Sequence, residues 1–146
     1  MSAVPYAYAD DIAVSDIAFH AWGKTLAETF QAAAEATLHA MLEQPERLAA
    51  TAQRSFELRD EQLDLLLLQF LQEFIYYKDA ERLLLRLQEV SIDQEEGGFV
   101  LRARAAGEQI NPDTQALGAD VKGVTLHRLQ VAQTADGWRA TVILDV

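Results

Sequence analysis

The strongest structural signal in this chain is a strict alternation of residue types at its C-terminal end. From Trp138 to Val146 the residue types alternate with a period of two. This is the pattern of a strand, in which successive side chains point to opposite faces. One face would carry Trp138, Ala140, Val142, Leu144 and Val146, and the other Arg139, Thr141, Ile143 and Asp145. A second run rich in Val, Thr and Leu precedes the turn-like Ala135-Asp136-Gly137. We therefore predict an antiparallel hairpin within residues 120–146.

The end of this hairpin carries two neighbouring acidic groups. Asp145 is followed by Val146, the last residue, whose terminal carboxylate lies next to the Asp145 side chain. Chain ends are ordered when a sheet holds them, and the apolar run from Val142 to Leu144 favours that here. Two fixed carboxylates repel each other until a hard cation or a basic group relieves the repulsion. The pair is therefore a candidate half of a cation site.

Length and composition limit the class of protein. At 146 residues with 50% hydrophobic residues, the chain fits one globular domain, residues 1–146. Because the chain has no Cys, disulfides, thiolate nucleophiles and zinc–thiolate clusters are excluded. No apolar run approaches the roughly 20 residues of a membrane span, so we expect no membrane partner. The N-terminus lacks the features of a secretory signal, and we expect a cytoplasmic protein.

The charge of the chain points to the kind of partner it suits. Lys and Arg number 12 against 23 Asp and Glu, which gives a net charge of -11. This balance argues against direct nucleic-acid binding through phosphates. It favours a partner with a basic surface, or it simply keeps a small protein soluble.

Two helices are predicted. Thr25 with Glu28 three residues later forms a capping-box pattern for the first, which Pro45 ends. The second, Leu-rich helix covers residues 60–77, with Asp60 as its expected cap. Its apolar stripe is wider than one sheet face needs, so this helix is expected to be central or to form an oligomer interface.

The remaining segments favour strands and loops. We expect an irregular lead-in over residues 1–9, a first strand over 12–22, and a short edge strand over 50–58. Residues 83–92 and 99–106 read as a hairpin, and residues 107–119 as a long polar connector. Together these elements predict an α+β fold, with two helices packed on a mixed, largely antiparallel sheet that contains the N- and C-terminal strands.

Asp16 is the charged residue inside the predicted first strand. First and last strands often lie side by side, and Asp16 would then join Asp145 and the Val146 carboxylate. Oxygen ligands of this kind suit Ca²⁺, or Mg²⁺ with waters. Alternatively, Asp16 pairs with Lys122 or Arg139, or caps a turn.

The three histidines do not form a catalytic group in this pattern. His20, His39 and His127 fall in separate predicted elements, and neither a Ser nor a Cys nucleophile accompanies them. We expect each of them to be a surface or partly packed side chain. His127 is the one most worth following, because it follows the Val124-Thr125 sequence.

Several stretches resemble the archease family. The residues 16–26, DIAFHAWGKTL, with Phe30 after them, are similar to the family's N-terminal signature. Residues 120–125, DVKGVT, with His127, and residues 138–146, WRATVILDV, resemble its closing block. Gly107-Glu108 and the Leu-rich helix occur in the family's order, so the resemblance covers nearly the whole chain.

This resemblance implies a function. Archeases are non-catalytic activators that promote guanylylation and turnover of an RtcB-type RNA ligase in tRNA splicing and RNA repair. The resemblance implies a bound divalent cation, Ca²⁺ first with Mg²⁺ or Mn²⁺ as alternatives, at the positions of Asp16, Asp145 and Val146. It also implies the ligase as partner, no direct nucleic-acid binding, and a monomer or weak homo-oligomer.

The sequence departs from the family pattern just before Asp16. Ala13-Val14-Ser15 stands where the family usually has His-Thr-Ala, with Asp10 and Asp11 upstream, and Leu126 stands where Tyr is common. A divergent or impaired member is one interpretation. Two other functions stay open: a metal-dependent hydrolase that uses the same carboxylates, and an acidic chaperone-like binding module without a metal.

Overall fold

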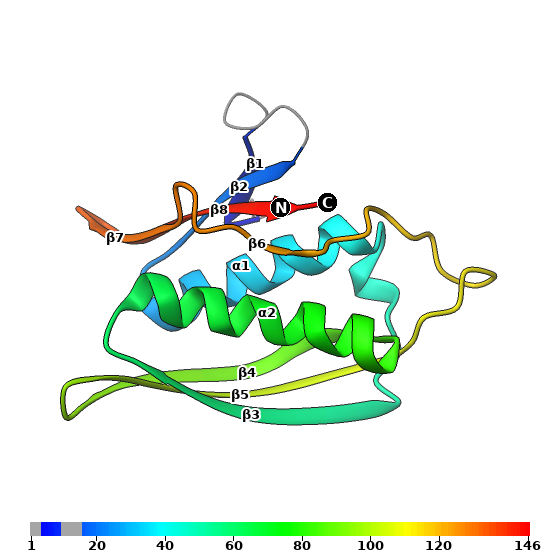
Figure 1. Ribbon diagram of the computed structural model, residues 1–146, viewed down its shortest axis with the longest axis horizontal. Coiled ribbons are helices and arrows are strands. Elements are labelled where there is room, and N and C mark those ends of the chain that lie inside the picture. The colour runs from blue at the N-terminus through cyan, green and yellow to red at the C-terminus, as the bar shows by residue number, and fades with distance from the viewer. Residues whose placement is uncertain (1–3, 10–15) are drawn as a thin grey trace.

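The computed structural model describes residues 4–9 and 16–146, which form strands, two long helices and one short 3₁₀ helix (Figure 1). In chain order the elements are β1 (Tyr6–Tyr8), β2 (Ile17–Gly23), α1 (Leu26–Met41), η1 (Pro45–Arg47), β3 (Ala52–Asp60), α2 (Leu63–Glu81), β4 (Leu83–Glu95), β5 (Gly98–Gln109), β6 (Gly123–Val124), β7 (Gln130–Thr134) and β8 (Gly137–Asp145).

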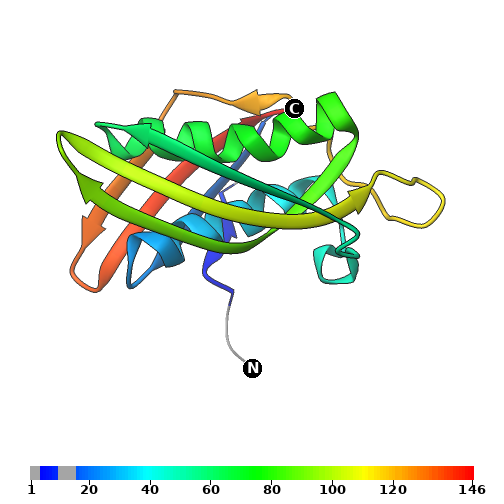
Figure 2. The same ribbon diagram turned by 90° about the horizontal axis from the view of Figure 1, so that it is seen from below.

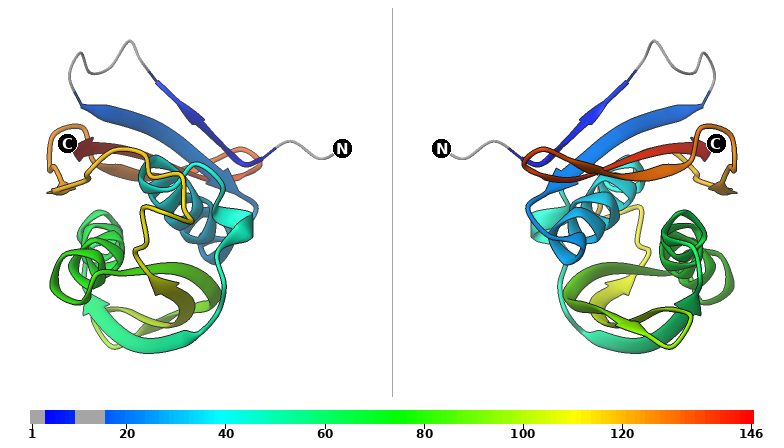
Figure 3. Two further views of the ribbon diagram at one scale, coloured as in Figure 1. Left: turned by 90° about the vertical axis from the view of Figure 1, so that its right-hand side faces the viewer. Right: turned by 90° about the vertical axis from the view of Figure 1, so that its left-hand side faces the viewer.

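The strands form two antiparallel sheets with the helices between them. One sheet has the order β1-β2-β8-β6, with β7 also paired to β8, and the other has the order β3-β5-β4. Seen end-on, the molecule has three layers, in which α1 and α2 lie side by side between the sheets (Figure 3). The predicted α+β class is confirmed, with the first and last strands in the same sheet. The sequence predicted a single sheet, whereas the structure divides the strands into two.

The start of α1 matches its predicted capping box. The Thr25 hydroxyl accepts a hydrogen bond from the Glu28 backbone N–H at 3.1 Å. The Glu28 carboxylate in turn accepts the backbone N–H of Lys24 at 3.3 Å. The first bond satisfies a donor that a helix start leaves unpaired, and the second ties the residue before the cap, Lys24, to the first turn. The helix ends at Met41, and Pro45 begins η1.

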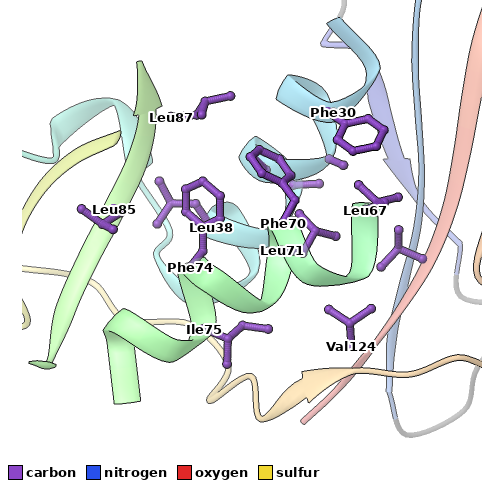
Figure 4. Close-up of a cluster of buried hydrophobic side chains, with 14 of the residues drawn as sticks. Phe30, Leu38, Leu67, Phe70, Leu71, Phe74, Ile75, Leu85, Leu87 and Val124 are labelled. Carbon is purple, nitrogen blue, oxygen red and sulfur yellow. The ribbon is translucent and has the colours of Figure 1, made fainter. Parts of the chain in front are cut away.

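The wide apolar stripe of α2 results from its position between the layers. The helix contacts strands of both sheets as well as α1, so it buries side chains on more than one face. Phe70 and Phe74 lie in the centre of this core, with Phe30 of α1 beside them (Figure 4). The prediction of a central helix is thereby confirmed.

The predicted helix cap was wrong. Asp60 is the last residue of β3, and α2 begins after Gln62. The Asp60 carboxylate instead accepts the backbone N–H of Gln62 and the side-chain amide of Gln69, both at 2.8 Å. It therefore closes the strand-to-helix turn rather than capping the first turn of the helix.

Two strands differ from the sequence expectation. Tyr6–Tyr8, expected to be irregular, forms β1 along the edge of β2, and the Tyr8 hydroxyl donates to the Ala36 carbonyl of α1 at 2.9 Å. β3 is an edge strand, as expected, but it runs from Ala52 to Asp60 along most of β5 (Figure 2). Both strands depend on partners distant in sequence, which local propensity does not reveal.

The β4–β5 hairpin is confirmed, with a register shift between Leu87 and Glu89. β5 extends to Gln109, so the long connector begins later than expected.

No helix in the part of the chain that the structure describes is long and apolar enough to cross a membrane.

Candidate functional site

The first long strand and the last strand are direct neighbours. β2 and β8 pair antiparallel from Ile17 opposite Leu144 to Gly23 opposite Trp138. Asp16 precedes Ile17, and Asp145 follows Leu144, so both acidic residues lie at the same end of the strand pair. The register therefore leaves Asp16 and Asp145 at neighbouring strand ends, and the approach of their carboxylates to one ion stays a prediction.

The alternation along these strands places the two acids on the outer face of the sheet. The inner face carries Phe19 and Val142, which are fully buried. The outer face carries Asp16 and Asp145 at one end. Asp145 is exposed and Asp16 is half-buried, whereas the next pair on this face, Ala18 and Ile143, is buried together with Ala9.

Neither acidic side chain binds another described residue. Within residues 4–9 and 16–146, neither Asp16 nor Asp145 makes a side-chain hydrogen bond or ion pair, so the expected alternative pairing with Lys122 or Arg139 is not observed there. Over the same residues, no three His, Asp or Glu side chains form a metal-binding group. A third carboxylate would come from Val146, whose side chain packs against the core.

The end of β8 is held by a chain of contacts from α2. The buried Lys78 donates to the Asp120 carboxylate at 2.7 Å and to the Val121 carbonyl at 2.6 Å. The next residue, Lys122, donates its backbone N–H to the Asp145 carbonyl at 2.7 Å. Through these bonds α2 fixes the segment that positions Asp145.

Electrostatics reinforce this anchor. Burial works to lower the pKa of Lys78, but hydrogen bonds and charges from Asp120 and Asp79 outweigh it and raise the pKa above its ordinary value. The hydrogen bond and charge of Lys78 lower the pKa of the Asp120 carboxyl. Sequence reasoning missed Lys78, although the buried stripe of Leu71 and Phe74 continues into it at helical spacing.

The three histidines lie apart, as predicted. His20 Nδ1 on β2 is 3.0 Å from the Thr141 hydroxyl, and His39 Nδ1 on α1 is 2.9 Å from the Tyr6 hydroxyl. His127 is exposed in the turn between β6 and β7. Asp10, Asp11 and Ala13-Val14-Ser15, the segment where the sequence departs from the pattern that it otherwise resembles, lie outside the described residues.

The chain matches the model of the Archease protein family (MTH1598/TM1083) over residues 6–146. It is 33% identical over 142 residues to the protein archease of Methanosarcina barkeri, covering 97% of this chain and 95% of that one. It is 32% identical over 133 residues to the protein archease of Pyrococcus furiosus, covering 90% of this chain and 93% of that one.

Two solved structures share the fold. The solution structure of protein 1598 of Methanobacterium thermoautotrophicum superposes with a TM-score of 0.84 at 28% identity, covering 99% of this chain and 100% of that one. The crystal structure of an archease and possible chaperone from Thermotoga maritima gives a TM-score of 0.59 at 16% identity, covering 92% and 93%. The second likeness supports the fold alone.

Proposed function

This chain belongs to the archease family, and we propose from this membership and its paired strand ends that it is a non-catalytic activator of an RtcB-type RNA ligase. In this role it promotes guanylylation and turnover of the ligase during tRNA splicing and RNA repair in the cytoplasm. It acts as a monomer or weak homo-oligomer through protein contact, without binding RNA or DNA itself. The observation that supports the proposal is the β2–β8 register, which pairs the strand that follows Asp16 with the strand that ends at Asp145.

A divalent cation is part of this proposal. The carboxylates of Asp16, Asp145 and Val146 would hold it, and their all-oxygen chemistry suits Ca²⁺, with Mg²⁺ or Mn²⁺ as alternatives. Two carboxylates without a partner among the described residues are the kind of donors that such an ion requires. Bound there, the ion would supply positive charge at an exposed acidic edge of the protein, where a ligase group could meet it.

A protein contact fits the charge of the chain better than an enzymatic reaction does. A hydrolase that used these carboxylates would need a general base and a cationic stabiliser beside the ion. His20 and His39 are each within hydrogen-bond distance of a hydroxyl group elsewhere in the fold. The net charge of -11 instead suits a partner with a basic surface.

A chaperone-like binding module without a metal is the second candidate. The relative from Thermotoga maritima is described as a possible chaperone, and such a role also rests on protein contact. The two candidates differ in their dependence on the ion. A chaperone-like module would bind its client equally well in the presence of a chelator, whereas the proposed activator would lose activity.

The direct test measures formation of the covalent ligase–GMP adduct from GTP. Addition of this protein should accelerate adduct formation over ligase alone. Asp145→Ala, or one residue added after Val146, should reduce the acceleration. Asp113→Ala removes an exposed acid from the connector between β5 and β6 and serves as the matched control, which should accelerate the reaction like the wild type. Equal activity of all variants would show that these carboxylates have no role in activation.

A further inference from the structure

The two outer strands of the three-stranded sheet differ in the regularity of their free edges. β5 lies in the middle of this sheet, with β3 and β4 at its edges (Figure 2). The pairing of β4 with β5 contains a register shift between Leu87 and Glu89. Irregular pairing of this kind bends and twists a strand, which is one way in which proteins keep a sheet edge from pairing further. The β4 edge therefore carries a protective feature.

The β3 edge is regular. β3 pairs with β5 from Ala52 to Asp60 without a register shift, and it contains neither Pro nor Gly. Among the described residues it has no second partner strand. Two charged residues of its outer face, Glu57 and Arg59, bind each other at 2.9 Å. Every second residue of such an edge directs its N–H and C=O away from the sheet, which makes the edge a template for one more strand.

The inner face of β3 leaves apolar surface uncovered at this edge. Phe56 and Leu58 pack against the core but remain half-buried, whereas Leu101 of the neighbouring β5 is fully buried. A pocket of about 400 Å³ lies between Leu58 and α2. Leu68 and Tyr76 of α2 line this pocket, and Tyr76 is 57% exposed. A strand added to β3 would cover this apolar surface.

Side-chain bonds between β3 and α2 hold the two walls of the pocket in place. Towards one end Arg54 binds Glu81 at 2.6 Å, and its guanidinium lies 5.7 Å from the centre of the Tyr77 ring. At the other end the Asp60 carboxylate accepts the side-chain amide of Gln69 at 2.8 Å. The groove between strand and helix is thus preformed, which lowers the entropic cost of binding.

The pocket contains one acid without a partner. Glu73 of α2 lines the pocket and is half-buried. Within the described part of the chain its carboxylate makes no hydrogen bond and no ion pair. Burial raises the pKa of this carboxyl, because its charged form is poorly solvated there. The other polar lining residues, Gln69 and Gln72, are uncharged, so the charge of the pocket suits a Lys or Arg side chain.

We propose that an extended, basic segment of another protein binds along β3 as an additional strand of the sheet. Its backbone pairs with the free edge, and an apolar side chain fills the pocket beside Leu58 and Tyr76. A Lys or Arg two residues away lies on the same face of the added strand and reaches Glu73. A second copy of this chain suits the edge less well, because each copy carries a net charge of -11. The proposal is independent of the proposed ligase function.

The test uses the full-length protein without ligase or added metal. The probe is a fluorescently labelled peptide, Ser-Thr-Val-Thr-Leu-Thr-Lys-Thr-Ser, whose Leu and Lys share one face of a strand. Its fluorescence anisotropy should rise to saturation on titration with the protein. A peptide with Glu in place of Lys should bind at least about tenfold more weakly. N-methylation of one alternate set of residues should abolish binding, and methylation of the other set should preserve it, because only one set of N–H groups faces β3.

Variants separate the charge contact from the apolar contact. Glu73→Gln should weaken binding of the Lys peptide about tenfold, and should leave binding of a peptide with Gln in place of Lys unchanged. Glu43→Gln changes an exposed acid that does not line the pocket and should match the wild type. Tyr76→Ala should weaken binding of both peptides. On addition of the Lys peptide, hydrogen exchange should slow in residues 52–60 and stay unchanged in residues 83–95.

The proposal would be overturned by the absence of a saturable anisotropy change, by equal binding of the Lys and Glu peptides, or by slower exchange in β4 instead of β3. Slow exchange of β3 that strengthens with the concentration of the protein alone would overturn it as well, because the edge would then pair with a second copy. Asp145→Ala should leave peptide binding intact, so failure of the cation or ligase proposal is distinguishable from failure of this one.

Discussion

The ammonium nitrogen of Lys78 lies 2.7 Å from the Asp120 carboxylate, although Lys78 belongs to α2 and Asp120 to the segment before β6. The same nitrogen donates to the Val121 carbonyl. The lysine side chain is 7% exposed, so the pair connects the buried face of a helix to the segment that supports the end of β8. This connection leads to the first two predictions.

Lys78→Met should destabilise the fold by about 1–3 kcal/mol, because the Val121 carbonyl would lose its charged donor in a buried environment. Methionine keeps the apolar stem of the side chain, so the change isolates the polar contacts. Urea unfolding followed by circular dichroism gives the free energy of unfolding. Lys122→Met, an exposed lysine of the same segment, should change it by less than about 0.5 kcal/mol. Equal effects of the two variants would contradict the assigned role of Lys78.

The same pair should make stability depend on pH at both extremes. Asp120 has a lowered pKa, so its contribution is present above the ordinary value of 3.8 and is lost as the pH falls through the folded value. Lys78 has a raised pKa, so its contribution is present below the ordinary value of 10.5 and is lost as the pH rises through the folded value. The difference in unfolding free energy between wild type and Lys78→Met should be largest between these limits. A difference that stays constant from acid to alkaline pH would argue against the ion pair.

Gly107→Ala should destabilise the protein by at least about 2 kcal/mol. A Cβ at this position of β5 would overlap the backbone carbonyl of Leu84 in β4, which cannot rotate away. Gly123→Ala is the control, because its Cβ would meet the Gln72 side chain at an ordinary 3.5 Å. Thermal unfolding should show a marked fall in Tm for the first variant and little change for the second. If Gly107→Ala unfolds like the wild type, the two strands are not packed as closely as described.

Phe70→Ala should cost about 3–5 kcal/mol, because it leaves a large cavity between the layers. Phe70 is fully buried, and its ring centre lies 5.7 Å from that of Phe30 and 5.3 Å from that of Phe74. Tyr76→Ala, on the same helix at 57% exposure, should cost less than about 1 kcal/mol. The denaturant midpoints of the two variants compare their losses of stability. A similar shift in both would contradict the central position of Phe70 in the core.

Local patterns predicted the elements that carry their own signal. The alternation from Trp138 to Leu144 predicted both faces of β8 correctly, and the capping box at Thr25 predicted the start of α1. Each depends on residues a few positions apart. The pairing of the first long strand with the last was a hypothesis about topology, which the register of β2 and β8 confirms, and the approach of the Asp16 and Asp145 side chains stays a prediction. Metal binding by these residues stays a prediction.

Features that depend on distant partners could not be predicted in this way. β1 is a strand because it pairs with β2, and nothing in Tyr6–Tyr8 itself requires that pairing. No local sequence pattern distinguishes the strands of one sheet from those of the other.

The most direct test of the central claim is a calorimetric titration with Ca²⁺ of the wild type, Asp16→Asn, Asp145→Asn and the control Asp113→Asn. If acids from the two ends of the chain share one ion, Asp16→Asn and Asp145→Asn should each weaken binding by about tenfold or more, because each removes a charged ligand. The combined variant should lose measurable binding, and Asp113→Asn should match the wild type. Wild-type affinity in either Asp16→Asn or Asp145→Asn would contradict a shared cation site.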